Sequence, residues 1–186
     1  MRNVLAYTFW HQPRTDVDRQ EYEGGTRLFH QRLAAVPIPG FVDSWTLQVP
    51  DLPWLPGGGY EDWYLVEDFA ALGTLAEHAV DSARADSHDV MARSVRDGTG
   101  GVYALLSGEP AANQSGWAGW FSKRDGTGYP HLRAELSQQL DEGVVLAVWQ
   151  RQLVLGPAPE FRVLAAGPVA VDGADLAVGV PVLMSG

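Results

Sequence analysis

The stretch NVLAYTFWHQPRTDVDRQEYEGGTRLFHQRLAAVPIPGFVDSWTLQV, residues 3–49, predicts a strand, a helix and a second strand. Residues 3–11 alternate between two faces of an extended chain, so Tyr7, Phe9 and His11 share one face. The helix that follows has an apolar stripe at helical spacing, formed by Tyr22, Phe29, Leu33 and Val36. The pair Gly24-Gly25 inside this helix predicts a close backbone approach or a kink, and Pro37 ends the helix. Residues 41–49 then alternate as a strand.

The next segments complete a known order of elements. Residues 60–67 predict a strand, and Asp68 can cap two helical pieces that meet at a kink near residues 81–82. The glycine-rich run at residues 97–101 predicts a loop, and residues 102–107 predict a strand. The order β-α-β-β-α-β over the first 107 residues is that of the split βαβ, or ferredoxin-like, arrangement.

The second half of the chain repeats part of this pattern. Placing Phe9 on Phe121 and Trp45 on Trp149 aligns predicted strands at residues 117–123 and 143–155 with those of the first half, around a helix at residues 129–140. A strand at residues 161–166 follows, and then a C-terminal hairpin around Asp172-Gly173 instead of a second long helix. We therefore predict an α+β fold with a complete ferredoxin-like repeat at residues 1–109 and a shortened, divergent repeat (βαββ plus the hairpin) at residues 115–186. The two repeats can form a single compact unit.

Large side chains occur on both faces of the predicted strands, as Trp10 beside Phe9 and Trp63 beside Tyr64 show. Sheets that are covered on both faces have this composition. Helices would cover one face of each sheet, and two such sheets facing each other would bury the second face. This is the architecture of an α+β barrel.

The composition excludes several classes of protein. The 186 residues include no cysteine, so disulfides and thiolate chemistry are excluded. A formal charge of -10 disfavours nucleic-acid binding. The N-terminal stretch lacks the features of a signal peptide, and no apolar run is long enough to cross a membrane, so we predict a cytoplasmic protein without a membrane partner.

Two histidines are our candidates for catalysis. His11 ends an aromatic strand face and His30 lies at the edge of the apolar helix stripe, where a partly buried imidazole can pass protons. His88 lies beside another buried stripe, whereas His78 and His131 are predicted to be exposed. Each of the first three, taken alone, is more simply explained as a polar side chain satisfied by water or backbone.

Charged and aromatic residues supply further candidates. Asp43 and Asp62 share strand faces with aromatic residues and could act as bases, although we favour positions near strand ends where water reaches them. Arg151 could anchor an anionic ligand or pair with an aspartate. The candidates for an aromatic ligand-binding wall, for which core packing is the alternative, are Trp10, Trp45, Trp54, Trp63 and Trp149. The sequence predicts no metal site, since the cluster Asp86, His88 and Asp89 does not share one helix face.

The run Tyr7-Thr8-Phe9-Trp10-His11, the helix carrying Tyr22, Phe29 and His30, and the repeated βαβ order resemble the dimeric α+β barrel superfamily. That superfamily includes antibiotic-biosynthesis monooxygenases, EthD-like proteins and chlorite dismutases. The resemblance implies a pocket between sheet and helices for an apolar or aromatic metabolite, used by a cofactor-independent monooxygenase or isomerase-type enzyme. Two alternatives stay open: a haem protein like the chlorite dismutases, for which His131 is the only candidate axial ligand, and a non-catalytic binding or assembly protein. No cofactor is predicted outside the haem alternative, and the chain can be a monomer or a homodimer.

Overall fold

Nine strands of the computed structural model, which describes residues 4–110, 116–152 and 156–184, form one antiparallel sheet. The first half of the chain contains β1 (Leu5–Pro13), α1 (Arg19–Ala35), β2 (Phe41–Val49), β3 (Gly59–Val66), α2 (Phe69–His78), α3 (Ala85–Ser94) and β4 (Val95–Gly108). The second half contains β5 (Trp117–Lys123), α4 (Tyr129–Asp141), β6 (Val145–Arg151), β7 (Phe161–Ala165), β8 (Ala174–Pro181) and β9 (Leu183–Met184).

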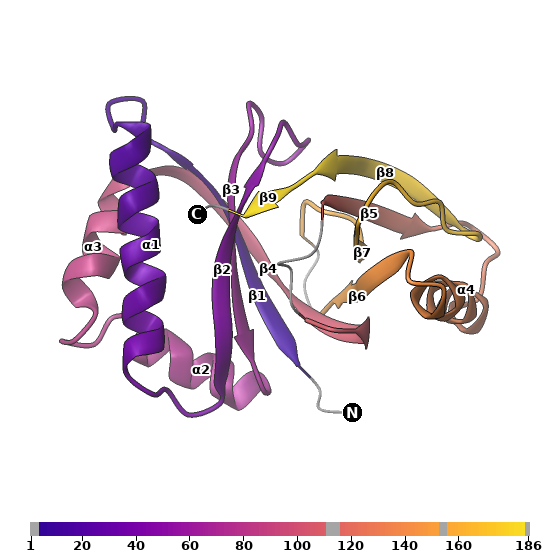
Figure 1. Cartoon of the computed structure of the whole chain (residues 1–186), viewed down its shortest axis with the longest axis horizontal. Coiled ribbons are helices and arrows are strands. Elements are labelled where there is room, and N and C mark those ends of the chain that lie inside the picture. Colours follow the sequence, from indigo (N-terminus) through magenta and orange to yellow (C-terminus); the bar gives the residue numbers. More distant parts are fainter. Residues whose placement is uncertain (1–3, 111–115, 153–155, 185–186) are drawn as a thin grey trace.

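The strand order is the same in both halves. The first half has the order β4-β1-β3-β2 and the second half β8-β5-β7-β6, and β4 pairs with β6 where the halves join. Only Val182 separates β8 from β9, and β9 pairs with β2 through Leu47–Met184 and Gln48–Leu183. One continuous segment therefore spans from β5 to β2 and closes the sheet into a barrel (Figure 1). The predicted tandem ferredoxin-like barrel is confirmed, whereas the division into domains at residues 109–115 stays a prediction.

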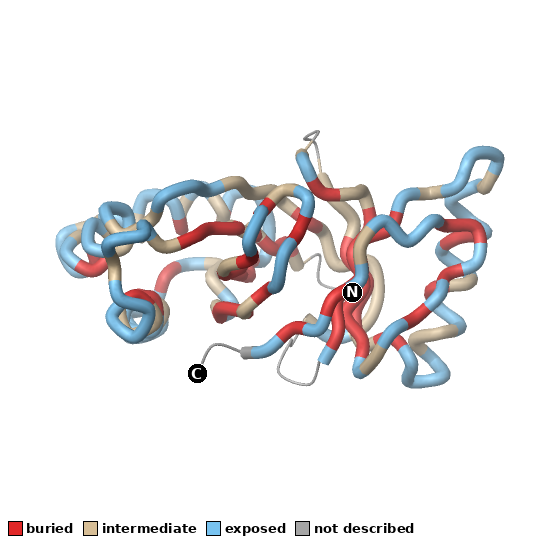
Figure 2. The backbone as a smooth tube through the Cα atoms, turned by 90° about the horizontal axis from the view of Figure 1, so that it is seen from above, coloured by how far each residue is buried: buried red, intermediate tan, exposed pale blue. Residues whose placement is uncertain are grey.

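The side chains sort into an interior and two outer layers. An aromatic cluster from both halves fills the barrel, and it includes Trp10, Trp63, Trp120 and Trp149. Helices α1, α2 and α3 cover the outer face of the first half, and α4 covers that of the second (Figure 1). Buried residues are concentrated in the central strands, and exposed ones in the helices and loops (Figure 2). No helix of the described residues combines the length and apolar character that a membrane crossing requires.

Strand β4 is longer than predicted. Residues 97–101 were expected to form a loop, but β4 begins at Val95 and pairs with β1 through Gly98 and Gly100. The ring of Phe9 occupies the space where a side chain on Gly98 would lie, and Thr8 O and the Tyr7 ring do so at Gly100. The glycines therefore belong to the strand because aromatic side chains of β1 lie over them.

Two other details differ from the sequence-based expectation. Residues 169–171 are not a strand, because Val169 and Val171 are buried against the α4 layer and the chain turns at Val171 before β8 pairs with β5. The predicted strand at residues 143–155 begins at Val145 and ends at Arg151, and residues 153–155 lie outside the described part.

One glycine of the Gly24-Gly25 pair has the predicted close approach, because Gly25 of α1 lies against the Met91 side chain of α3.

Candidate functional site

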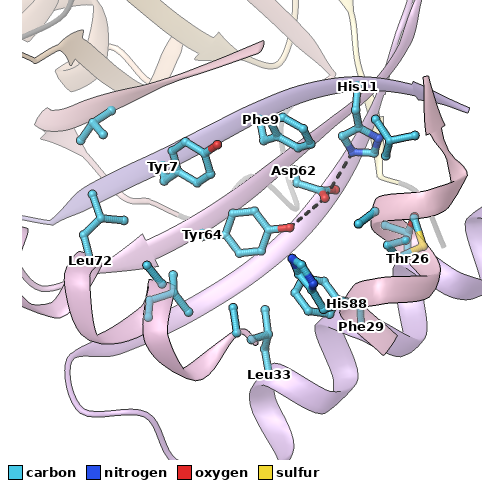
Figure 3. Close-up of a pocket in the computed structure, with 17 residues that line it drawn as sticks. Tyr7, Phe9, His11, Thr26, Phe29, Leu33, Asp62, Tyr64, Leu72 and His88 are labelled. Carbon is cyan, nitrogen blue, oxygen red and sulfur yellow. Dashed lines mark hydrogen bonds and ion pairs between the residues drawn. The ribbon is translucent and has the colours of Figure 1, made fainter. Parts of the chain in front are cut away.

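A cavity with a volume of about 690 Å³ lies between the first-half sheet and its three helices. Cavities of this size hold drug-sized molecules. Its floor comes from β1, β3 and β4, and its walls come from α1, α2 and α3 (Figure 3). The lining side chains are Tyr7, Phe9, His11, Thr26, Phe29, Leu33, Asp62, Tyr64, Leu72, Leu75, Ala76, Ala79, His88, Met91, Ala92, Val95 and Val102.

The cavity has a polar end and an apolar end. His11, Asp62 and Tyr64 lie together on the sheet side, whereas Leu72 and Leu33 lie toward the other end (Figure 3). Ala76 of α2 and Ala92 of α3 line the cavity and are exposed to solvent, so its mouth lies between these two helices. Among the described residues, the second half has no equivalent of α2 and α3, because residues 166–173 connect β7 to β8. A smaller cavity of about 150 Å³ lies between α4 and strands β4 and β6.

Asp62 is the centre of the polar end. It is 5% exposed, and its two oxygens are held from opposite sides. Thr46 Oγ1 donates to Oδ1 at 2.6 Å, and His30 Nε2 lies 3.3 Å from the same oxygen. Tyr64 Oη donates to Oδ2 at 2.9 Å, and His11 Nε2 lies 3.2 Å from Oδ2 as an ion-pair contact (Figure 3). A buried carboxylate with four partners is positioned rigidly.

The partners decide the protonation states. Burial raises the pKa of the Asp62 carboxyl, but the charges and hydrogen bonds of His11 and His30 lower it by more, so the pKa of Asp62 lies well below its usual range. Burial, and then the neighbouring Asp62 charge, raise the pKa of Tyr64 well above its usual value. Asp62 is therefore an anion and Tyr64 a neutral donor at neutral pH.

A second layer of aromatic rings orients His11. Its Nδ1 is hydrogen-bonded to the Tyr22 hydroxyl, and its ring stacks on Tyr60 and on Phe9. Tyr60 Oη in turn donates to Glu23 at 2.7 Å. Burial and the hydrogen bond to Glu23 raise the pKa of Tyr60 to about 12. Both ring nitrogens of His11 therefore contact protein side chains, Nδ1 the Tyr22 hydroxyl and Nε2 the Asp62 carboxylate.

His30 lies behind the cavity and not in its lining. Its Nδ1 is 2.7 Å from Ser44 Oγ, and its Nε2 is 3.0 Å from Thr46 Oγ1. Its side chain is 11% exposed, and Ser44 is partly exposed on β2. The two histidines predicted as catalytic residues therefore share one carboxylate, one from the cavity side and one from the side of β2.

The predicted aromatic wall lies elsewhere. Trp10, Trp45, Trp63 and Trp149 point into the barrel interior, on the opposite face of the sheet from the cavity. Trp54 does not cover the cavity mouth but packs against Trp10 and Trp120, where its proline-rich loop closes one end of the barrel. Arg151 bonds the carbonyl oxygens of Gly156 and Ala158. None of these six lines the cavity.

The remaining candidates divide between the cavity and the surface. Asp43 is exposed, because a bulge at Phe41–Asp43 shifts the alternation of β2. The expectation that water reaches Asp62 is wrong, because β3 is central in the sheet and α1 covers it. His88 lines the cavity near its mouth with a side chain that is 37% exposed. His131 is exposed, as predicted, whereas His78 is only partly exposed, and each faces an aspartate.

Several side chains that contact Asp62 or His11 are not among the site residues predicted from the sequence. Tyr22 was assigned only to the helix core, and Thr46, Ser44 and Tyr64 were not considered as partners of a carboxylate. It also missed Glu61, which is fully buried inside the barrel and bonded to Arg162. The sequence feature that indicates buried carboxylates is the segment Tyr60–Tyr64, where two adjacent acidic residues interrupt a strand that is otherwise aromatic. Within the described residues, no group of three or more potential ligands is placed to hold a metal ion.

No protein-family model matches the chain, and no curated protein matches it. Solved structures do match in fold. The "putative monooxygenase" of Lactobacillus acidophilus NCFM aligns over 99% of this chain and 95% of its own, with a TM-score of 0.59 and 8% identity. That of Fusobacterium nucleatum aligns over 99% and 93%, with a TM-score of 0.56 and 10% identity. A "putative chlorite dismutase" aligns over 97% and 93%, with a TM-score of 0.55 and 9% identity. The chain therefore shares its fold with these structures, an α+β barrel in which both ferredoxin-like halves belong to one polypeptide.

Proposed function

We propose that the chain binds a small apolar or aromatic metabolite in the cavity of the first half and removes a proton from it. The observation that carries this proposal is the buried Asp62 carboxylate, which faces an otherwise apolar cavity of ligand size. A general base must lie within hydrogen-bond reach of the bound molecule, and the Asp62 carboxylate lines the cavity, whereas both ring nitrogens of His11 already contact Tyr22 and Asp62. Similarity of fold to monooxygenase-like proteins supports this class of chemistry but does not carry it alone.

Proton removal is the step that cofactor-independent oxygenation and isomerisation share. The Asp62 carboxylate takes a proton from an acidic C–H or O–H group, and the electron pair stays on the ligand as an enolate or phenolate. Returning the proton to another carbon is an isomerisation, whereas oxygenation requires dioxygen as a further reactant. Tyr64 Oη and His11 hold the carboxylate in place for this step.

Ligand charge gives a first selectivity. The lining contains no lysine or arginine among the described residues, and its one carboxylate is anionic. A neutral alcohol or ketone is therefore favoured over a carboxylate of the same shape, because like charges in a buried site cost several kcal/mol. We expect 2-naphthol to bind at least about tenfold more tightly than 2-naphthoate, which is about 1.4 kcal/mol.

The residues do not fit a haem. His131, the candidate axial ligand, is exposed and faces Asp172, and the small cavity of the second half does not include it. The larger cavity has two histidines in its lining, but it offers no cation to the two carboxylates of a haem.

Two measurements test the proposal. Titration with 2-naphthol, followed by the fluorescence of the ligand, should show saturable binding that Ala76→Trp abolishes by filling the mouth and that Ala134→Trp on exposed α4 leaves intact. The protein should also accelerate the exchange of the α-protons of 2-tetralone in D₂O, observed by NMR, and Asp62→Asn should stop it. Binding without exchange would favour the non-catalytic binding protein, and absence of binding would overturn the proposal.

A further inference from the structure

The cavity and the solvent are connected by a continuous line of proton-carrying groups. Asp62 borders the cavity, Thr46 and His30 contact its Oδ1, and Ser44 contacts the far nitrogen of His30. The successive distances are 2.6, 3.0 and 2.7 Å along Asp62, Thr46, His30 and Ser44. Each is short enough for a proton to move along an existing hydrogen bond.

The other partners of Asp62 do not lead outward. His11 is 1% exposed, and its far nitrogen is bonded to Tyr22, which is equally buried. Tyr64 is buried and ends at the carboxylate itself. On the His30 side, in contrast, Ser44 is partly exposed and its neighbour Asp43 is exposed. Asp43 Oδ1 also accepts from the Ser44 backbone N–H at 2.8 Å, so a surface carboxylate lies directly beside the hydroxyl.

We propose that Asp62, Thr46, His30 and Ser44 form a proton relay between the cavity and solvent at the edge of β2. The relay operates when Asp62 has been protonated and is uncharged, with His30 neutral, its proton on Nδ1 and its Nε2 facing Thr46. A proton that Asp62 has taken up passes to the Thr46 oxygen while the Thr46 proton moves to His30 Nε2. His30 then gives its Nδ1 proton to Ser44, whose own proton leaves to water. The net change is one proton moved from the cavity to solvent and the conversion of His30 from its Nδ1–H to its Nε2–H tautomer, which must revert before the next proton passes.

This inference rests on the proposed function for its purpose, because a base can act a second time only after the proton that it has taken up is released. It assigns His30 a role that contact with the ligand does not explain, since His30 is absent from the cavity lining. His30 and Ser44 are therefore positioning and relay residues, and Asp62 is the group that meets the ligand.

The relay is testable without any ligand. In protein whose cavity mouth is filled by Ala76→Trp, NMR of ¹⁵N-labelled histidine measures the exchange of the His11 Nε2 proton with water, and the route of that proton to solvent then leads through Asp62 and His30. We expect Ser44→Val to slow this exchange several-fold, because it replaces the exit hydroxyl with an apolar group. His30→Gln should do the same. Ser122→Val, on an exposed position of β5, is the matched control and should change nothing.

A purely structural role of Ser44 predicts the opposite sign. Losing a packing hydrogen bond loosens the site and speeds exchange, so exchange that is faster or unchanged in Ser44→Val overturns the relay. Circular dichroism of both variants confirms that they are folded. If exchange slows but neither 2-naphthol nor 2-tetralone is a ligand, the relay stands and the proposed function fails. If both ligands behave as proposed but exchange does not slow, the relay alone fails.

Discussion

The imidazole of His30 lies almost parallel to the phenol ring of Tyr64, with centroids 5.3 Å apart and 17° between the planes. The two side chains contact opposite oxygens of Asp62, His30 at Oδ1 and Tyr64 at Oδ2. Their stacking links α1 to β3 across the back of the cavity, so the residues that hold the carboxylate also hold the helix on the sheet. Stability and site geometry are therefore coupled at Asp62.

Replacing Asp62 with asparagine should destabilise the protein by about 3 kcal/mol, because the histidines lose their anionic partner inside the fold. Since the folded pKa of Asp62 lies below the unfolded value, its contribution is present above about pH 4 and is lost as the pH falls through the folded pKa. Urea unfolding of both proteins between acidic and neutral pH measures this difference. If the free energy of unfolding of Asp62→Asn fell with decreasing pH as steeply as that of the unchanged protein, the lowered pKa of Asp62 would be contradicted.

All six tyrosines should ionise at a higher pH than free tyrosine, because the pKa of each is raised in the folded protein. Burial is the largest cause for five of them, and a hydrogen bond to Glu160 is the largest cause for Tyr129. The five are Tyr7, Tyr22, Tyr60, Tyr64 and Tyr103. Because the folded pKa values are raised, this stabilisation is present below about pH 10 and is lost as the pH rises toward the folded values. Ultraviolet titration of tyrosinate should show little absorbance change near pH 10 and a steep rise on alkaline unfolding, in contrast to the urea-unfolded chain.

The ion pair inside the barrel should be sensitive to the loss of one partner. Glu61 and Arg162 are both 0% exposed, and the Arg162 guanidinium carbon lies 4.5 Å from the ring centroids of both Trp63 and Trp120. Glu61→Gln or Arg162→Met should each cost about 3–5 kcal/mol, because an uncompensated charge stays buried. The double variant Glu61→Gln/Arg162→Met should be more stable than the sum of the single effects predicts. Urea unfolding of the two single variants and the double variant measures this difference, and free energies of unfolding that add would show that the two charges do not interact.

Two glycine-to-alanine changes should have opposite signs. Gly98→Ala should destabilise by about 1–3 kcal/mol, because the new methyl group meets the Phe9 ring. Gly24→Ala should stabilise by about 1 kcal/mol, because alanine is the better helix former and nothing lies within 4 Å. Thermal unfolding of the two variants checks both. Stabilisation by Gly98→Ala would mean that Phe9 does not lie over β4.

The order of elements was predictable because it depends on alternation and helical spacing within short segments. Tyr7, Phe9 and His11 were correctly placed on one face, and Asp68 caps α2 as expected. The glycines of β4 were misassigned because their reason to be extended is the Phe9 ring, which is almost 90 residues away in sequence. Local composition contains no information about such a contact.

The candidate site was predictable only in part. His11 and His30 were selected by their position on strand and helix faces, and both do contact one carboxylate. The burial of Asp62 depends on β3 being central in the sheet, a property of strand order that no local pattern reports. The tryptophans occur on the correct strands, but alternation does not distinguish the barrel interior from the helix-covered face. Whether they or the histidines bind a ligand stays a prediction.

The two-residue pairing of β9 with β2 has a consequence for synthesis of the chain. During translation the first half can form its four strands while the free edge of β2 still lacks a neighbour. Exposed strand edges recruit other strands, including those of a second nascent copy. Strand β9 can cover this edge only after the second half has been synthesised, so until then the edge of β2 is free to pair with another copy of the chain.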